Sequence, residues 1–88
     1  MNNILHTLAN QIRIRILLCL ADEPKSVQEL INNCGLAQSA VSQHLVKLKR
    51  AGLVTSRRDG KFVYYRLTFP EAAILSLEIE EFIRKVSK

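Results

Sequence analysis

Apolar residues recur with a helical period in five stretches of the chain, and an alternating pattern replaces it in one region near the end. The predicted helices are 2–8, 11–21, 27–33, 38–50 and about 70–86, and the predicted strands are 53–58 and 61–67. Helix 11–21 is apolar nearly all round, which places it at the centre of the domain. The order predicts an α+β fold, mainly α, with a two-stranded hairpin between the fourth and fifth helices.

Capping residues set the predicted ends of several helices. Asn10 can cap the helix that follows it, and Ser26 with Glu29 forms the S-x-x-E pattern of a capping box. Thr68 and Glu71 repeat that pattern around a proline, which a first turn tolerates. These signals predict where the second, third and last helices begin.

Two consecutive helices and a glycine turn form a helix-turn-helix layout. Helix 27–33 leads into helix 38–50 through a connection containing Gly35, which is free to adopt the left-handed conformation that a helix end needs. Helix 38–50 has a buried stripe at i, i+4 and i+7, which consists of Val41, Leu45 and Leu48. Its opposite side is short, uncharged and hydrogen-bonding at the N-terminal end and basic further on.

That outer side favours contact with DNA, because Gln and Ser can donate to and accept from base edges in a major groove. We expect base contacts from Ser39, Ser42 and Gln43, with Gln38 and His44 at the flanks. We expect phosphate contacts from Lys47, Arg50, Arg57, Arg58 and Lys61. A merely solvated helix face is the alternative, and His44, only 60° from the buried stripe, is alternatively a partly buried structural residue.

The hairpin is indicated by Asp59-Gly60, a strong signal for a two-residue turn. Such a turn pairs Arg58 with Lys61 and Val54 with Tyr65. It also places a set of apolar side chains on the core face, namely Val54, Val63, Tyr65 and Leu67. Like charges facing each other across a hairpin are unfavourable, so the predicted pairing suggests an anion at the tip.

Composition supports one small folded domain over residues 1–88, because 48% of the residues are hydrophobic and 24% are charged. The segment 25–66 carries eight basic residues against two acidic ones, a net charge of +6 within a total of +5. A basic middle segment is typical of a polyanion partner, and membrane binding fits less well because the bases do not line one amphipathic helix. No membrane span or signal peptide is apparent, so we expect a cytoplasmic protein.

The terminal helices carry apolar stripes beyond what the core needs. In the last helix the stripe consists of Leu75, Ile79, Phe82, Ile83 and Val86, and in the first it consists of Ile4, Leu5 and Leu8. We expect these residues to pack on a second subunit. Packing back within the same subunit is the alternative, since small domains need every apolar face they can bury.

Site chemistry typical of enzymes is missing from the sequence. Cys19 and Cys34 lack C-x-x-C spacing and we expect them to be free, small core residues. His6 and His44 belong to no cluster with metal-ligand spacing, and neither a catalytic triad nor a glycine-rich phosphate loop occurs. We therefore predict no enzymatic activity, no cofactor and no metal site.

Taken together, the residues resemble the ArsR/SmtB family of bacterial and archaeal winged-helix repressors over 5–67. The resemblance rests on Arg13-Ile14-Arg15-Ile16-Leu17, on Gln38-Ser39-Ala40-Val41-Ser42-Gln43-His44-Leu45 and on Arg57-Arg58-Asp59-Gly60-Lys61-Phe62-Val63-Tyr64-Tyr65. It implies a homodimer, paired through the first and last helices, that binds an imperfect palindrome upstream of genes and represses them.

Departures from the family pattern concern regulation. Relatives that bind arsenite, cadmium or lead have a Cys-x-Cys pair where this chain has Ser26 and Gln28, and the last helix lacks the histidine and aspartate of zinc- or nickel-binding relatives. Ala37 replaces the serine that usually caps the recognition helix. Two alternatives stay open: a thiol- or sulfide-responsive repressor using Cys19 or Cys34, and a winged-helix module that binds an acidic protein.

Overall fold

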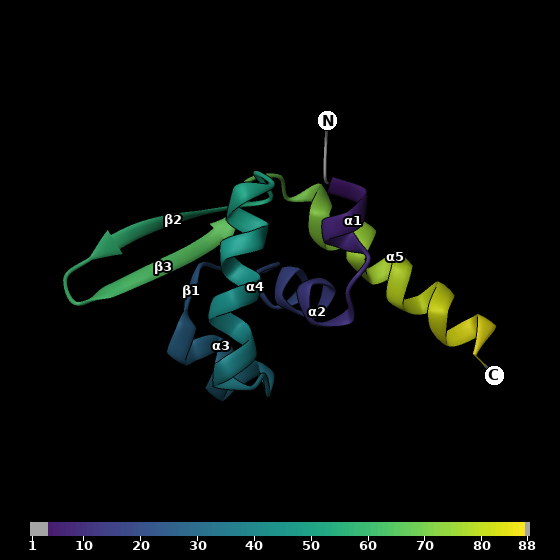
Figure 1. Ribbon diagram of the computed structural model, residues 1–88, viewed down its shortest axis with the longest axis horizontal. Helices are drawn as coiled ribbons and strands as arrows, with labels where there is room; N and C mark the ends of the chain where they lie inside the picture. The colour runs from purple at the N-terminus through teal and green to yellow at the C-terminus, as the bar shows by residue number, and fades with distance from the viewer. Residues whose placement is uncertain (1–3, 88) are drawn as a thin grey trace.

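The computed structural model describes residues 4–87 as five helices and a small antiparallel sheet (Figure 1). The helices are α1 (Ile4–Leu8), α2 (Gln11–Cys19), α3 (Val27–Cys34), α4 (Gln38–Arg50) and α5 (Glu71–Val86), and the strands are β1 (Lys25–Ser26), β2 (Val54–Asp59) and β3 (Phe62–Leu67). This confirms the predicted α+β, mainly α, winged helix-turn-helix fold. The predicted start of the first helix, Asn2 and Asn3, lies outside the described residues.

The core forms where α2 meets α3, α4 and the base of the sheet. Its fully buried side chains include Ile16, Leu17, Leu30, Leu45 and Val54. Burying a large aliphatic side chain contributes about 1.5 to 3 kcal/mol, so this cluster dominates the stability of the domain. The wing, formed by β2 and β3, and helix α5 extend from the core in opposite directions, with α4 between them (Figure 1).

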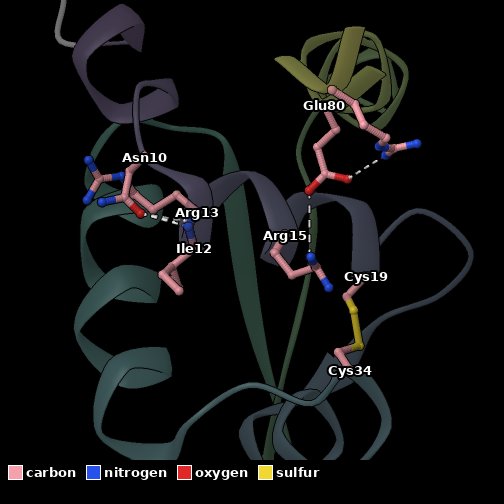
Figure 2. Close-up of polar contacts among 8 residues, drawn as sticks. Asn10, Ile12, Arg13, Arg15, Cys19, Cys34 and Glu80 are labelled. Carbon is pink, nitrogen blue, oxygen red and sulfur yellow. Dashed lines mark hydrogen bonds and ion pairs between the residues drawn. A yellow bond between two sulfur atoms is a disulfide. The ribbon is translucent and has the colours of Figure 1, made fainter. Parts of the chain in front are cut away.

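Two predicted helix caps are confirmed and one is wrong. The Asn10 side chain accepts hydrogen bonds from the backbone of Ile12 and Arg13 at 2.9 and 3.2 Å (Figure 2), and Ser26 with Glu29 forms the capping box. The capping box predicted at Thr68 does not form. Pro70, which already has helical dihedral angles, occupies the cap position of α5 instead of Thr68, and it makes no cap bond because its ring has no acceptor atom.

The sheet has three strands in the order β1-β3-β2, one more than predicted. In β1, Lys25 pairs with Tyr65 and Ser26 pairs with Tyr64. Two residues are too few to show an alternating pattern, which explains why this strand was not predicted. Through it, the start of α3 is fixed to the base of the wing.

The register of the hairpin differs from the predicted one by two residues. Asp59 pairs with Phe62, Arg58 with Val63 and Val54 with Leu67, so the two-residue turn is Gly60-Lys61. Gly60 has a φ of 65°, and among the described residues no side-chain-bearing residue has a positive φ. A turn at Asp59-Gly60 would need positive φ at Asp59 as well, whereas the observed turn needs it only at the glycine. The predicted repulsion between Arg58 and Lys61 is therefore wrong.

A shift of two residues leaves the faces of the strands unchanged, because side chains alternate with a period of two. Val54 is fully buried, and Tyr65 and Leu67 pack against the core. The predicted core face of the hairpin is therefore retained at Val54, Tyr65 and Leu67, whereas Val63, nearer the turn, is half-buried and lies outside the core cluster.

The prediction that the two cysteines are free is wrong. Cys19 and Cys34 form a disulfide (Figure 2). Helix α2 ends at Cys19, two residues earlier than expected, and α3 extends to Cys34. These two helix ends meet in space, with Cα atoms 6.3 Å apart, although 15 positions separate them in the sequence. A separation of this length carries no motif, so only the packing of α3 against α2 reveals the pair.

Helix α5 packs against α2 through small side chains. Ala72 and Ser76 are buried at this contact, and Glu80 forms ion pairs with Arg15 of α2 at 3.6 Å and with Arg84 at 3.9 Å (Figure 2). Most of the predicted apolar stripe points away from the core and is exposed, namely Leu75, Phe82, Ile83 and Val86, while Ile79 is half-buried. Within residues 4–87, no helix is long and apolar enough to cross a membrane.

Candidate nucleic-acid interface

Helix α4 has the two faces that its sequence predicts. Val41, Leu45 and Leu48 are fully buried, and they hold the helix against α2 and α3. The predicted contact residues on the other side are exposed, namely Gln38, Ser39, Ser42, Gln43, Lys47 and Arg50. The helix begins at Gln38 with Ala37 at the cap position and no side-chain cap bond. An exposed polar helix on a rigid buried stripe is a suitable element for reading a groove.

The wing presents the second part of the predicted interface. Arg57 and Arg58 near the end of β2 and Lys61 in the turn are all exposed. Lys49 of α4 donates a 2.6 Å hydrogen bond to Ser56 of β2, which joins α4 to the base of the wing. Sequence reasoning missed this contact because the two residues carry no pattern that relates them.

The basic side chains of this surface are not neutralised by acids. In the described part of the chain, ion pairs occur at Lys25, Arg15 and Arg84, and none involves a basic residue of α4 or of the wing. Charges left unpaired on one side create a positive potential that attracts polyanions. The surface defined by the exposed residues of α4 and of the wing is called the basic surface below.

His44 has different surroundings from its neighbours on α4. Its ring is half-buried, and its Nδ1 atom lies 3.2 Å from a guanidinium nitrogen of Arg13 on α2. Burial lowers the pKa of His44 below its ordinary value, and the positive charges of Arg13 and Lys47 lower it further. The structure thus places this histidine in the partly buried environment that was the alternative to a flanking DNA contact.

Metal-ligating groups do not cluster in residues 4–87, where no three His, Cys, Asp or Glu side chains come close enough to hold an ion. Ser26 and Gln28 occupy the positions at which relatives have their Cys-x-Cys pair, and Ser26 is engaged in the capping box. The acidic side chains described in α5 include Glu80, which is occupied by ion pairs to arginines.

Comparison with known proteins places the chain in a family. Residues 10–56, which include α2, α3, α4 and the start of the wing, match the model of the bacterial regulatory protein, arsR family. The chain belongs to the ArsR family of bacterial regulatory proteins. The predicted resemblance is confirmed, and so is the prediction of a transcriptional regulator rather than an enzyme, because the matched relatives are named as regulators.

One curated relative is the transcriptional activator HlyU of Vibrio cholerae, which is 44% identical over 68 residues, covering 77% of this chain and 63% of HlyU. The chain spans about half to two thirds of the length of the curated relatives it matches. Two solved structures share the fold. The repressor BigR of Xylella fastidiosa has a TM-score of 0.78 and 35% identity, covering 91% of this chain and 82% of BigR.

The other structure is a homodimeric winged helix-turn-helix DNA-binding domain, Mb0332 of Mycobacterium bovis, described as a possible ArsR-family regulator. It has a TM-score of 0.76 and 30% identity, covering 94% of this chain and 77% of that domain. Relatives named as activator and as repressor therefore share one fold with this ArsR-family chain.

Proposed function

We propose that this protein is a homodimeric transcriptional regulator that binds a palindromic operator in bacterial or archaeal DNA and acts as a repressor in the cytoplasm. The observation that carries the proposal is the basic surface, where an exposed polar helix stands beside a wing whose bases have no acidic partner. A helix presented in this way fits a major groove, and a basic hairpin beside it fits the phosphates alongside.

The residues of the basic surface divide by role. Ser39, Ser42 and Gln43 lie in the N-terminal half of α4 and contact base edges, with Gln38 at their flank. Bases further along the helix and in the wing hold phosphates, namely Lys47, Arg50, Arg57, Arg58 and Lys61. His44 belongs to neither group, because its ring lies against Arg13.

Pairing of two subunits is supported by the apolar surface of α1 and α5. Leu5 is 82% exposed and Phe82 is 65% exposed, and Leu75, Ile83 and Val86 are exposed as well. An open groove of about 560 Å³ lies between α5 and the segment that joins the end of α1 to the start of α2, and it is lined partly by Leu8, Ile79 and Ile83, all predicted interface residues. Patches of this kind on a small protein mark an interaction surface, and a two-fold dimer would match a palindromic operator.

The test is an electrophoretic mobility shift or fluorescence anisotropy titration with DNA from upstream of the gene. Gln43→Ala should cost about 1 to 3 kcal/mol at one position of each half-site and relax the sequence preference there. Arg58→Ala should weaken binding to all sequences alike and reduce the slope of log K against log salt by about one. Lys85→Ala, in the last turn of α5, is the matched control and should leave the slope unchanged.

An unchanged salt slope for Arg58→Ala would contradict the role of the wing. Failure of the wild-type protein to bind any upstream DNA, together with binding to acidic proteins, would favour the interaction module instead. A reporter gene behind the operator determines the direction of regulation, and lower expression in the presence of the protein is the expected result.

The disulfide favours a second candidate function, a thiol-responsive regulator. Cys34 is the last residue of α3 and immediately precedes Gly35 in the turn that leads into α4. Oxidation of the two thiols by hydrogen peroxide forms the S–S bond and two molecules of water, and a dithiol reverses it by being oxidised to its own disulfide. Because the bond fixes the end of α3 to the end of α2, its reduction releases a constraint on the start of the recognition helix.

The thiol-responsive function is tested by measuring operator affinity after reduction with a dithiol and after oxidation with peroxide. A difference of tenfold or more is expected for the wild-type protein, and Cys19→Ser and Cys34→Ser should show no response. Equal affinity of the two wild-type states would exclude this candidate, while leaving DNA binding itself intact.

A further inference from the structure

Arg13 is a charged residue in the interior, with only 5% of its surface exposed. Its Nε donates to the carbonyl of Thr7 at 2.6 Å and an Nη atom donates to the carbonyl of His6 at 3.4 Å, both at the end of α1. The other Nη atom lies 3.2 Å from Nδ1 of His44 on α4. A buried guanidinium needs such partners, and here they join three helices.

The side chain is held in place by its own helix. Arg13 lies in the first turn of α2, where its backbone N–H donates to the capping side chain of Asn10 (Figure 2). No ion pair engages Arg13 in the part of the chain that the structure describes. The directional bonds of the guanidinium to α1 and α4 are therefore its stabilising contacts.

The contact determines the chemical state of His44. Guanidinium nitrogens can only donate, so Nδ1 must accept and the proton of the neutral ring is on Nε2. Burial lowers the pKa of His44, as do the charges of Arg13 and of Lys47 on its own helix. Helix α1 adds two carbonyls and the titratable side chain of His6, and it contains no acidic residue that would favour a protonated ring.

We propose that Arg13 is a positioning residue that, through His44, fixes the rotation of the recognition helix relative to α1 and so couples operator binding to subunit pairing. The inference rests on the proposed function. The buried stripe of α4 consists of apolar side chains, whose packing is not directional. The hydrogen bond from Arg13 to His44 is directional. Because His44 directly follows Gln43, this bond fixes the orientation of the residues expected to read bases.

Operator binding is coupled to subunit pairing through the hydrogen bonds that Arg13 donates to α1. The carbonyls of His6 and Thr7 belong to the helix on which Leu5 is exposed for a partner subunit. A partner that orders α1 also orders the acceptors of Arg13. Thermodynamic linkage makes this coupling reciprocal. The factor by which operator DNA changes the affinity between subunits equals the factor by which subunit pairing changes the affinity for operator DNA.

The pH dependence distinguishes positioning from direct phosphate contact. Protonation makes Nδ1 a donor that faces a guanidinium, so the bond to Arg13 is lost. Operator affinity should then fall as the pH drops below 6.5 and through the lowered pKa of His44. A histidine that contacts phosphate would behave oppositely, because the anion favours the protonated ring and binding would strengthen as the pH falls.

Substitutions of His44 separate the two roles further. His44→Asn places an oxygen near the position of Nδ1 and cannot titrate, so it should bind operator within about twofold of wild type at pH 7.5. Its affinity should also lack the decrease that the wild type shows between pH 6.5 and 5. His44→Leu removes the acceptor and should bind about tenfold more weakly at pH 7.5.

The experiment measures operator affinity from pH 5 to 8 for the wild type, His44→Asn and His44→Leu, and measures subunit affinity with and without operator by sedimentation. Thermal unfolding shows that each variant is folded at the assay temperature, and Arg13→Lys, which keeps the charge but loses the planar fork, should resemble His44→Leu. The operator should strengthen pairing less in His44→Leu than in the wild type.

Wild-type affinity that rises as the pH falls, with no rise in His44→Asn, would overturn the inference in favour of phosphate contact. Equal operator affinity of His44→Leu and the wild type would also overturn it. Both results leave DNA binding intact, whereas failure of the wild type to bind DNA would instead refute the proposed function.

Discussion

Helices α4 and α5 are both amphipathic, yet they use their apolar faces in opposite ways. In α4 the large apolar side chains are buried and the outer face is polar and basic. In α5 the inner face is built from Ala72 and Ser76, and large apolar residues such as Phe82 face outward. The difference teaches that an apolar stripe in a sequence does not by itself show whether the subunit that carries it buries it: the stripe of α4 is buried, whereas that of α5 is largely exposed.

The largest expected effect on stability comes from replacing a leucine with alanine, a substitution that can be made on both α4 and α5 for comparison. Leu45→Ala in α4 removes a side chain that is 1% exposed and should lower the free energy of unfolding by about 2 to 5 kcal/mol at any protein concentration. Leu75→Ala in α5 should cost about 1 kcal/mol in the monomer, because that leucine is 44% exposed and so loses less buried surface than Leu45 does. Urea unfolding at several protein concentrations measures both, and equal costs at low concentration would contradict the contrast.

A charge placed on the outer face of α5 should abolish pairing. Phe82→Glu should weaken the dimer by about 3 kcal/mol, or at least 100-fold in Kd, because each subunit loses a buried ring and gains a charge at the interface. Sedimentation velocity at tens of micromolar provides the measurement. The matched control is Glu81→Lys on the exposed neighbouring position, which should remain dimeric, and a dimeric Phe82→Glu protein would disprove the role of this face.

The inner face of α5 contains an unsatisfied polar atom. The hydroxyl of Ser76 is fully buried and has no hydrogen-bond partner in the structure. Ser76→Ala should therefore raise the free energy of unfolding by about 1 to 2 kcal/mol, since a buried unpaired hydroxyl carries a desolvation cost. Chemical denaturation measures this gain, with Ser87→Ala beyond the end of the helix as the control, and a loss of stability would show that the hydroxyl has a partner in solution.

The smallest expected effect concerns Ala37, the N-cap residue of α4. Ala37 has extended dihedral angles suited to a cap but no side chain that can accept a bond. Ala37→Ser should stabilise the protein by about 1 kcal/mol, and Ala37→Val should not. Thermal unfolding compares the variants, and an unchanged midpoint for the serine variant would show that solvent already satisfies the start of this helix.

The parts of the fold that short-range patterns determine were predictable from the sequence. The bounds of α4 agree with the prediction because its period and its flanking turn both lie within a few residues. The hairpin register was missed by two residues because Gly60 can be either the second or the first central residue of a two-residue turn, and the sequence does not show that Asp59 avoids the positive φ that the first choice requires.

Contacts between distant side chains were not predictable. Cys19 and Cys34 meet only after α3 folds against α2, and Arg13 reaches His44 across 31 positions of sequence. Both depend on how helices pack, which a single sequence does not encode in a local motif. The sequence predicted which side of α4 and which wing residues form the exposed candidate interface, but it left open whether His44 is half-buried.

The order of the sheet has a consequence for self-association. Strand β2 lies at an edge, and β1 pairs with only two residues of β3, so backbone donors and acceptors along the wing stay open to another strand. Such edges template aggregation unless charge prevents the approach of a second copy. Arg57 and Arg58 place positive charge along this edge, so two wings repel each other. Substitutions that neutralise them would therefore expose the protein to edge-to-edge pairing.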